Sequence, residues 1–203
     1  MSDFSGTGMP FVEALQTLHE ARTDEVVVTT MGSGREWPKI SSHPLDFVYV
    51  PSSMGQATSV GLGIALAQPD RKVVVCNGDG SMLMNLGSLV TITSQSPQNL
   101  IVLLMDNGIY EVTGSQQTPG SAGLRVDDRN VDFTSVARSC GFESVFEFSD
   151  LDAWRESVAD VLQTPGPVFC ALKVASVEGD AAPRSPGPAW ERAAALRTAL
   201  VEG

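Results

Sequence analysis

The sequence predicts an α/β fold in which a single doubly wound parallel sheet carries helices on both faces. Two observations lead to this prediction. Short apolar runs alternate with segments of helical spacing along most of the chain, and this alternation is typical of a parallel sheet covered on both sides. Two of the runs, at residues 73–76 and 100–105, are apolar throughout, which indicates strands buried on both faces.

The first half of the chain supplies the opening elements. Apolar residues at helical spacing predict a helix over residues 11–21, and β-branched residues predict a strand over 25–30. The two glycines within residues 31–34 predict a turn. A short strand is expected at 46–50. A helix rich in small residues, which permit close packing against a neighbour, is expected at 57–67.

The second half continues the alternation. Strands are expected where apolar residues run together, at 73–78, 100–105, 144–148 and 167–174. Helices are expected where apolar residues recur every three or four positions, at 82–93, 133–140, 151–162 and 189–201. Two segments lack a clear period. Residues 111–129 predict a long mobile loop, and residues 179–188 predict a Pro-rich segment before the last helix.

Composition limits the classes of function. The 203 residues, 42% of them apolar, suit one domain spanning 1–203 with a full core. A net charge of −11 without a basic run argues against binding to nucleic acid or an anionic membrane. Cys76, Cys140 and Cys170 form no CxxC pair, so we expect reduced, mostly buried thiols. No leader-like start or apolar run of about 18 residues is present, which predicts a soluble cytoplasmic protein.

Two polar motifs follow the two most apolar strands. Residues 78–81 read Gly-Asp-Gly-Ser, and residues 106–110 read Asp-Asn-Gly-Ile-Tyr. A right-handed crossover between parallel strands brings Asp79 and Asn107 to one edge of the sheet, beside the start of a helix. Carboxylate and amide oxygens at such a place suit a hard cation that bridges to phosphate. Gly-Asp-Gly alone is a common turn, and the spacing to Asn107 distinguishes it from one.

These motifs resemble the diphosphate-binding domain of thiamine diphosphate enzymes, which has Gly-Asp-Gly, a gap of about one crossover, and a pair ending in Asn. The resemblance covers residues 25–174. It implies that Asp79 and Asn107 bind Mg²⁺ through their side chains and that Ile109 offers its main-chain carbonyl. Asp106 departs from the first Asn that the family often has, at a position that is usually not a direct ligand.

The resemblance also implies contacts to the cofactor. In Ser53-Met54-Gly55 the family places a bulky apolar residue that props the cofactor in its bent conformation, so Met54 is the candidate; a core Met is the alternative. The turn with Gly32 and Ser33 would lie near the diphosphate. It does not fit a dinucleotide fingerprint, because Trp37 occupies the third position of that pattern. The full set of implied cofactor-binding residues is Gly32, Ser33, Ser53, Met54, Gly55, Gly78, Gly80, Ser81, Met82 and Tyr110.

The sequence allows two roles for each of several polar residues. His43 either enters the active site or lies on the surface, and His19 is expected to be exposed. Glu111 and Gln116 border the predicted loop and either touch substrate or touch water. Arg35 and Arg184 each either bind an anionic group or are solvated.

The residue that activates the cofactor is missing from the implied set. In the family a glutamate of a separate pyrimidine-binding domain promotes loss of the C2 proton, and this chain has no room for that domain. The resemblance therefore implies an alpha-type partner subunit, in a heterotetramer or larger assembly, with the active site at the interface.

Within the family, Ser-Met-Gly, Gly-Asp-Gly-Ser and Asn-Gly-Ile-Tyr-Glu-Val-Thr-Gly most resemble the sulfopyruvate and phosphonopyruvate decarboxylases, and this chain resembles the beta-type subunit of the split members. The implied activity is decarboxylation of a small 2-oxo acid. Two alternatives stay open: a carboligase subunit of the acyloin or acetolactate synthase type, and a catalytically silent cofactor-binding module that regulates a partner.

Overall fold

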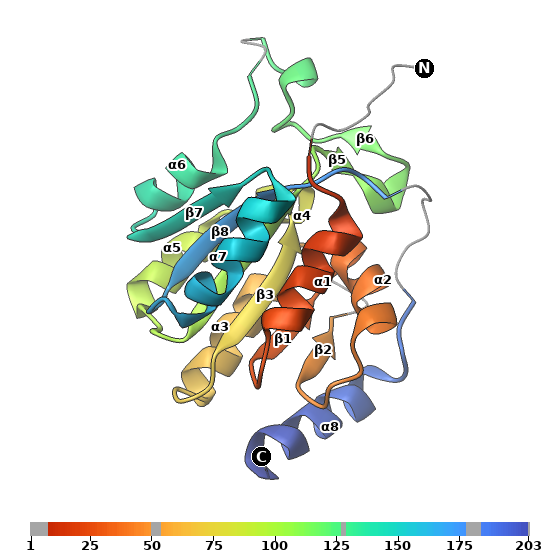
Figure 1. The fold of residues 1–203 in the computed structure, drawn as a ribbon, viewed down its shortest axis with the longest axis vertical. Coiled ribbons are helices and arrows are strands. Elements are labelled where there is room, and N and C mark those ends of the chain that lie inside the picture. Colours follow the sequence, from red (N-terminus) through yellow and green to blue (C-terminus); the bar gives the residue numbers. More distant parts are fainter. Residues whose placement is uncertain (1–7, 50–53, 127–128, 178–183, 203) are drawn as a thin grey trace.

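A computed structural model describes residues 8–49, 54–126, 129–177 and 184–202. It contains a six-stranded, fully parallel sheet with the strand order β2-β1-β3-β4-β8-β7 (Figure 1). Its strands are β1 (Val26–Thr29), β2 (Asp46–Val48), β3 (Val73–Gly78), β4 (Leu100–Asp106), β7 (Ser144–Phe148) and β8 (Val168–Lys173). A separate antiparallel pair is formed by β5 (Ile109–Tyr110) and β6 (Gln116–Gln117).

Helices cover both faces of the sheet, which confirms the predicted doubly wound class (Figure 1). One face carries α1 (Phe11–Ala21), α2 (Met31–Ile40) and α7 (Leu151–Gln163). The other carries α3 (Ala57–Ala67), α4 (Asp79–Met84), α5 (Gly87–Gln95) and α6 (Phe133–Ser139). The last helix, α8 (Ala189–Glu202), contacts edge strand β2, and two short 3₁₀ helices are η1 (Glu111–Thr113) and η2 (Ala122–Leu124).

The central strands explain why the sheet needs two covering layers. Val74 and Cys76 of β3 belong to one apolar core, whereas Val73 and Val75 belong to the other. Successive side chains of a strand point to opposite faces, so a strand with apolar side chains on both faces is stable only between two helical layers. Helices of the same layer also contact each other. The indole Nε1 of Trp154 in α7 donates to the carbonyl oxygen of Ala14 in α1 at 3.1 Å.

All three cysteines carry free thiols, as predicted. Cys76 and Cys170 are buried in the core, and burial raises the pKa of the Cys76 thiol to about 12. Among the residues that the structure describes, no helix is long and apolar enough to cross a membrane.

The strand order creates a crevice at one end of the sheet. The chain leaves β1 through α2 to reach β2 on one side, and returns through α3 to β3 on the other side of β1. The connections after β1 and β3 therefore diverge at their carboxyl ends. Ligands of open α/β sheets bind at such a reversal of strand order, so the topology points to the ends of β1 and β3.

The predicted turn at residues 31–34 is instead the first turn of α2. Gly34 N donates to the Thr30 carbonyl oxygen at 3.1 Å, which closes the helix at its start. Glycine is a poor helix former, but Trp37 is completely buried in the core under α1 and fixes the helix by packing.

The predicted helix over residues 82–93 is divided into α4 and α5. The break lies at Asn85, whose backbone leaves the helical region with φ −146° and ψ 48°. Its side-chain amide donates to the carbonyl oxygen of Gly55 at 3.1 Å. A contact with a distant segment thus decides where α4 ends.

Close packing of α3 on β3 gives a test of the fold. A Cβ on Gly61 would lie 2.1 Å from Cγ2 of Val75, whereas a Cβ on Gly63 of the same helix would meet nothing within 4 Å. We expect Gly61→Ala to lower the free energy of unfolding by about 1–3 kcal/mol through overpacking. Gly63→Ala should raise it by up to about 1 kcal/mol through helix propensity. Urea denaturation of both variants measures this, and equal effects would contradict the packing described for α3.

Candidate active site

A cavity of about 120 Å³ lies at the reversal of strand order. The carboxyl ends of three neighbouring strands reach it: Thr30 follows β1, Asp79 follows β3 and Asn107 follows β4. Most other lining side chains are apolar, namely Phe11, Met31, Met54, Met84, Met105, Ile109, Tyr110 and Val112. The cavity is therefore an apolar chamber with a few polar groups at the ends of the strands.

Most residues predicted from the sequence line this cavity. They are Gly32, Ser33, Met54, Gly78, Asp79, Gly80, Ser81, Asn107, Ile109 and Tyr110. Two others do not line it: the side chain of Met82 is completely buried in the apolar core, and Gly55 lies just behind the wall. Ser53 lies outside the described residues.

Gly55 fixes the neighbouring Met54 at the cavity. Gly55 N donates to Ser81 Oγ at 2.9 Å, and a Cβ on Gly55 would lie 2.5 Å from the Ser81 carbonyl oxygen. Only glycine accommodates this approach together with a φ of 85°. Met54 is left with a side chain 54% exposed at the cavity, which excludes the alternative that it is a core methionine.

Asp79 is the central polar residue of the cavity. It is 1% exposed, and its Oδ2 accepts a hydrogen bond from Thr118 Oγ1 at 3.2 Å. Its Oδ1 has no hydrogen-bond partner. Burial, together with the nearby charge of Asp106, raises the pKa of the Asp79 carboxyl to about 7, although the Thr118 hydroxyl and the main-chain N–H groups of Gly80 and Asn107 oppose the shift.

The other predicted ligands lie on the adjoining turn. Asn107 Oδ1 accepts a hydrogen bond from Ile109 N at 3.1 Å. This bond holds the Asn107 side-chain amide beside the main chain of Ile109, whose carbonyl is the other predicted ligand. Asp106 is occupied elsewhere, because Lys173 Nζ lies 2.6 Å from its Oδ2. Among the described residues no group of three or more His, Cys, Asp or Glu side chains is placed to hold a metal ion. A cation here would depend on one carboxylate supported by amide and carbonyl oxygens.

Buried polar atoms without partners gather at this end of the sheet. They include the hydroxyls of Thr29 and Thr30, both polar atoms of the Asn77 side chain, and Asp79 Oδ1. A buried polar atom left unpaired costs about 1–3 kcal/mol, and native proteins leave few of them. Their concentration at the ends of β1 and β3 fits a site that is completed by a polar ligand and a cation.

The predicted mobile loop at 111–129 has regular structure where it is described. β5 and β6 pair as Ile109↔Gln117 and Tyr110↔Gln116. In the sequence, η1 precedes β6 and η2 follows it. The hairpin lies directly on α4, since a Cβ on Gly80 would be 2.6 Å from the Tyr110 ring. The sequence shows no period there because each strand is only two residues long.

Glu111 fastens the cavity wall rather than facing solvent. It is 6% exposed, and its Oε2 lies 3.1 Å from Arg35 Nη2 while its Oε1 accepts from Val177 N at 2.7 Å. A Cβ on Gly32 would lie 2.8 Å from the same Oε2. Glu111 therefore ties the start of α2 and the segment after β8 to the hairpin, and Arg35 takes part in this link.

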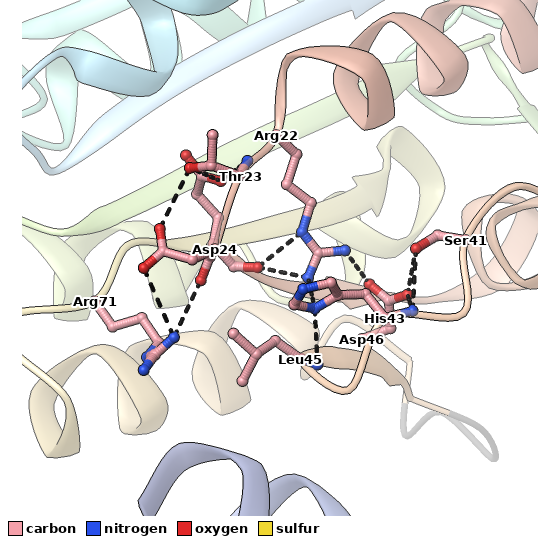
Figure 2. A network of polar contacts seen from close by, with 9 residues as sticks. Arg22, Thr23, Asp24, Ser41, His43, Leu45, Asp46 and Arg71 are labelled. Atoms are coloured by element: carbon pink, nitrogen blue, oxygen red, sulfur yellow. Dashed lines mark hydrogen bonds and ion pairs between the residues drawn. The ribbon is translucent and has the colours of Figure 1, made fainter. Parts of the chain in front are cut away.

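His43 does not enter the cavity, which corrects the first of its two readings. It precedes β2, at the amino end of the sheet, where its Nδ1 lies 3.1 Å from Arg22 Nη2 (Figure 2). Its main-chain N donates to Asp46 Oδ2 at 2.9 Å, and Arg22 and Asp46 form an ion pair. This network closes the end of the sheet opposite the cavity.

Three further residues lie away from the cavity. His19 is half-buried rather than exposed, because its ring packs edge-on against Trp37 with centroids 5.9 Å apart. Gln116 is exposed and bonds to Thr113 within the hairpin. Arg184 is exposed, and it is not among the residues that line the cavity.

Sequence reasoning missed several residues of the site. Phe11, Met84 and Thr30 line the cavity, and Thr118, which directly follows β6, donates to Asp79. Phe11 comes from α1, far away in sequence, and nothing in its helical pattern distinguishes it. Thr118 stands in a polar stretch whose one local signal, the Pro-Gly that follows, indicates only a turn.

The raised pKa of Asp79 predicts how stability depends on pH. Between about pH 4 and 7 the folded chain holds a proton that the unfolded chain has lost, so stability falls as the pH rises through this window. In metal-free buffer Asp79→Asn should exceed the parent in free energy of unfolding by about 2–4 kcal/mol at pH 8 and by almost nothing near pH 4. Asp70→Asn, at an exposed position, is the control. A gap that does not change with pH would contradict the assignment.

The buried link through Glu111 predicts a loss of stability. Glu111→Ala removes the hydrogen-bond acceptor of Val177 N and one of the ion-pair partners of Arg35, which keeps Glu36 at 2.7 Å. We expect a loss of about 2–3 kcal/mol in urea denaturation. Glu13→Ala, which removes a half-exposed pair with Arg155, should cost below about 1 kcal/mol. Equal losses would show that Glu111 does not anchor the wall.

Comparison with known proteins agrees with this geometry. The profile of the family described as thiamine pyrophosphate enzyme, C-terminal TPP binding domain, matches residues 38–172. The chain is 41% identical over 170 residues to a phosphonopyruvate decarboxylase of Streptomyces viridochromogenes, which covers 82% of this chain and 40% of that protein. It is 42% identical over 164 residues to the sulfopyruvate decarboxylase subunit beta of Methanothermobacter thermautotrophicus, which covers 80% of each.

The lengths of these relatives differ. The chain spans less than half of the Streptomyces protein but most of the Methanothermobacter subunit. An X-ray structure of a Mycobacterium smegmatis protein assigned to the thiamin diphosphate-dependent enzymes has a TM-score of 0.66 at 22% identity, covering 87% of this chain and 34% of that one. At this identity the likeness shows the fold. Because the matched profile spans the crossover from Asp79 to Asn107, the chain belongs to the thiamine pyrophosphate enzyme family, through its C-terminal cofactor-binding domain.

Proposed function

We propose that this chain is the small subunit of a two-component, thiamine diphosphate-dependent 2-oxo acid decarboxylase. One observation carries the proposal: a buried carboxylate with an unpaired oxygen, Asp79, shares a cavity with Asn107, Ile109 and the exposed side chain of Met54. The Asp and Asn oxygens, with a main-chain carbonyl, suit a cation. The apolar chamber suits an organic cofactor.

In this proposal Asp79, Asn107 and the Ile109 carbonyl hold Mg²⁺. Magnesium takes oxygen ligands in octahedral geometry and is usually bound by one or two protein groups together with phosphate. The same cavity is lined by Gly80 and Ser81, in the first turn of α4, and by Gly32 and Ser33, in the first turn of α2. Free N–H groups at helix starts favour phosphate, so these residues would hold the diphosphate.

Met54 supports the identification of the organic part. Its side chain stands over the cavity, fixed by the bonds of Gly55 to Ser81 and Asn85. A bulky apolar group in that place would prop a bent cofactor. Bound there, thiamine diphosphate supplies the electron sink that decarboxylation of a 2-oxo acid requires.

The glutamate that promotes loss of the C2 proton of the cofactor would come from an alpha-type partner. Among the described residues that line the cavity the carboxylates are Asp79 and Glu111. Asp79 is committed to the cation, and Glu111 is held by Arg35 and Val177. Neither is available to activate a cofactor. The name of the Methanothermobacter relative, a beta subunit, also favours a two-component enzyme. We propose a heterotetramer or larger assembly.

The substrate class follows from the same relatives. They are named for sulfopyruvate and phosphonopyruvate, so we propose a small 2-oxo acid as the substrate of the complex. Reconstitution of the chain with its alpha-type partner, Mg²⁺ and thiamine diphosphate should give release of carbon dioxide from one of these acids. Formation of an acyloin would instead indicate carboligation, and persistent inactivity of a cofactor-loaded complex would favour a silent regulatory module.

The metal assignment has a direct test. Asp79→Ala and Asn107→Ala should each weaken magnesium-dependent binding of thiamine diphosphate to the complex by at least about tenfold, because each removes an oxygen ligand. Asp70→Ala removes an exposed carboxylate and serves as the control. Isothermal titration calorimetry measures the binding. If the Asp79 variant binds cofactor and metal as tightly as the parent, the site has been placed wrongly.

A further inference from the structure

We infer that Thr118 is a positioning residue that sets how Asp79 is presented to the cation. This inference rests on the proposed function, because it concerns the proposed magnesium site. Thr118 is 1% exposed, and its Oγ1 lies 3.2 Å from Asp79 Oδ2. Since an ionised carboxylate only accepts hydrogen bonds, the hydroxyl donates to it. Oδ1 is left as the oxygen without a partner.

The hairpin delivers this hydroxyl. Thr118 directly follows β6, and its main-chain N donates to the Gly108 carbonyl oxygen at 2.9 Å. Gly108 stands between the two other proposed ligands, Asn107 and Ile109. Ser121 Oγ lies 3.3 Å from Thr118 Oγ1 and donates to the same Gly108 carbonyl oxygen. The segment that carries two proposed ligands thus also holds the hydroxyl that orients the third.

Gly80 makes room for this arrangement. A Cβ at that position would lie 2.6 Å from the Tyr110 ring and 3.3 Å from Cγ2 of Thr118. The second glycine of Gly-Asp-Gly therefore allows the hairpin to reach the first turn of α4. Without that approach the hydroxyl would not reach Asp79.

The hydrogen bond has a consequence for the choice of metal. With Oδ2 bonded to Thr118, Asp79 offers one oxygen, which suits the octahedral shell of Mg²⁺. Ca²⁺ accepts bidentate carboxylates and more ligands. We therefore expect Thr118 to favour Mg²⁺ over Ca²⁺ as well as to strengthen binding of Mg²⁺.

The test compares variants that differ in the hydroxyl. Thr118→Ser keeps the hydroxyl, and Thr118→Ala, whose side chain is almost as small as that of serine, lacks it. Thr118→Val also lacks the hydroxyl but keeps the branched shape of threonine. In the complex with its partner, at saturating thiamine diphosphate, calorimetric titration with Mg²⁺ and with Ca²⁺ gives both dissociation constants. Thr91→Val, which removes an exposed hydroxyl on α5 away from the cavity, is the control.

We expect Thr118→Ala and Thr118→Val to weaken Mg²⁺ binding about tenfold or more and Ca²⁺ binding less, because outer partners of metal ligands typically contribute 10–100-fold. Thr118→Ser and Thr91→Val should stay close to the parent. Equal Mg²⁺ affinity for Thr118→Ser and Thr118→Ala would overturn the inference, since packing alone would then explain the site. A parent complex that binds no Mg²⁺ with the cofactor would overturn the proposed function itself.

Discussion

Asp79 carries a carboxylate that the fold removes from water while leaving one of its oxygens without a protein partner. Burial raises the pKa of this group to about 7, so the metal-free chain loses stability when the group ionises. Thr118 compensates part of this cost through one hydrogen bond, and Lys173 balances the neighbouring Asp106. A cation at Oδ1 would compensate the rest. The buried Asp79 carboxylate is therefore suited to pair with a bound cation.

The fold brings the partners of Asp79 together through strand register and close backbone contacts. Thr29 is level with Cys76 across β1 and β3, and Gly78 is level with Met105 across β3 and β4. The three strands consequently end within three residues of one another, and their connections meet at one cavity. Glycines then admit the covering segments: Gly80 accepts the hairpin and Gly55 accepts Ser81. Rigid sheet ends and close approaches of the main chain give the site its definition.

The sequence was sufficient to predict the sheet and the meeting of Asp79 with Asn107. Buried parallel strands are long apolar runs, and the handedness of the crossover fixes where their ends lie. The Gly-rich start of α2 and the break at Asn85 were not predictable in the same way, because Trp37 and Gly55 impose them through contacts with distant segments. Local propensity competes poorly with such packing.

The hairpin was hidden for a different reason. Its strands are too short to show alternation, and the role of Thr118 depends on a residue 39 positions away. His43 illustrates the opposite error. A histidine in a loop suggests chemistry, but its loop joins α2 to β2 and lies at the amino end of the sheet. Position relative to the carboxyl ends of the strands decides which polar residues can act together.

We propose that this chain supplies the metal and diphosphate half of an active site that a second chain completes. A crystal structure of the complex with thiamine diphosphate and Mn²⁺ in place of Mg²⁺ tests it most directly, through the anomalous signal of the metal. We expect one peak between Asp79, Asn107 and the Ile109 carbonyl, with a glutamate of the partner against the aminopyrimidine ring. A peak elsewhere, or an aminopyrimidine contacted only by residues of this chain, would contradict it.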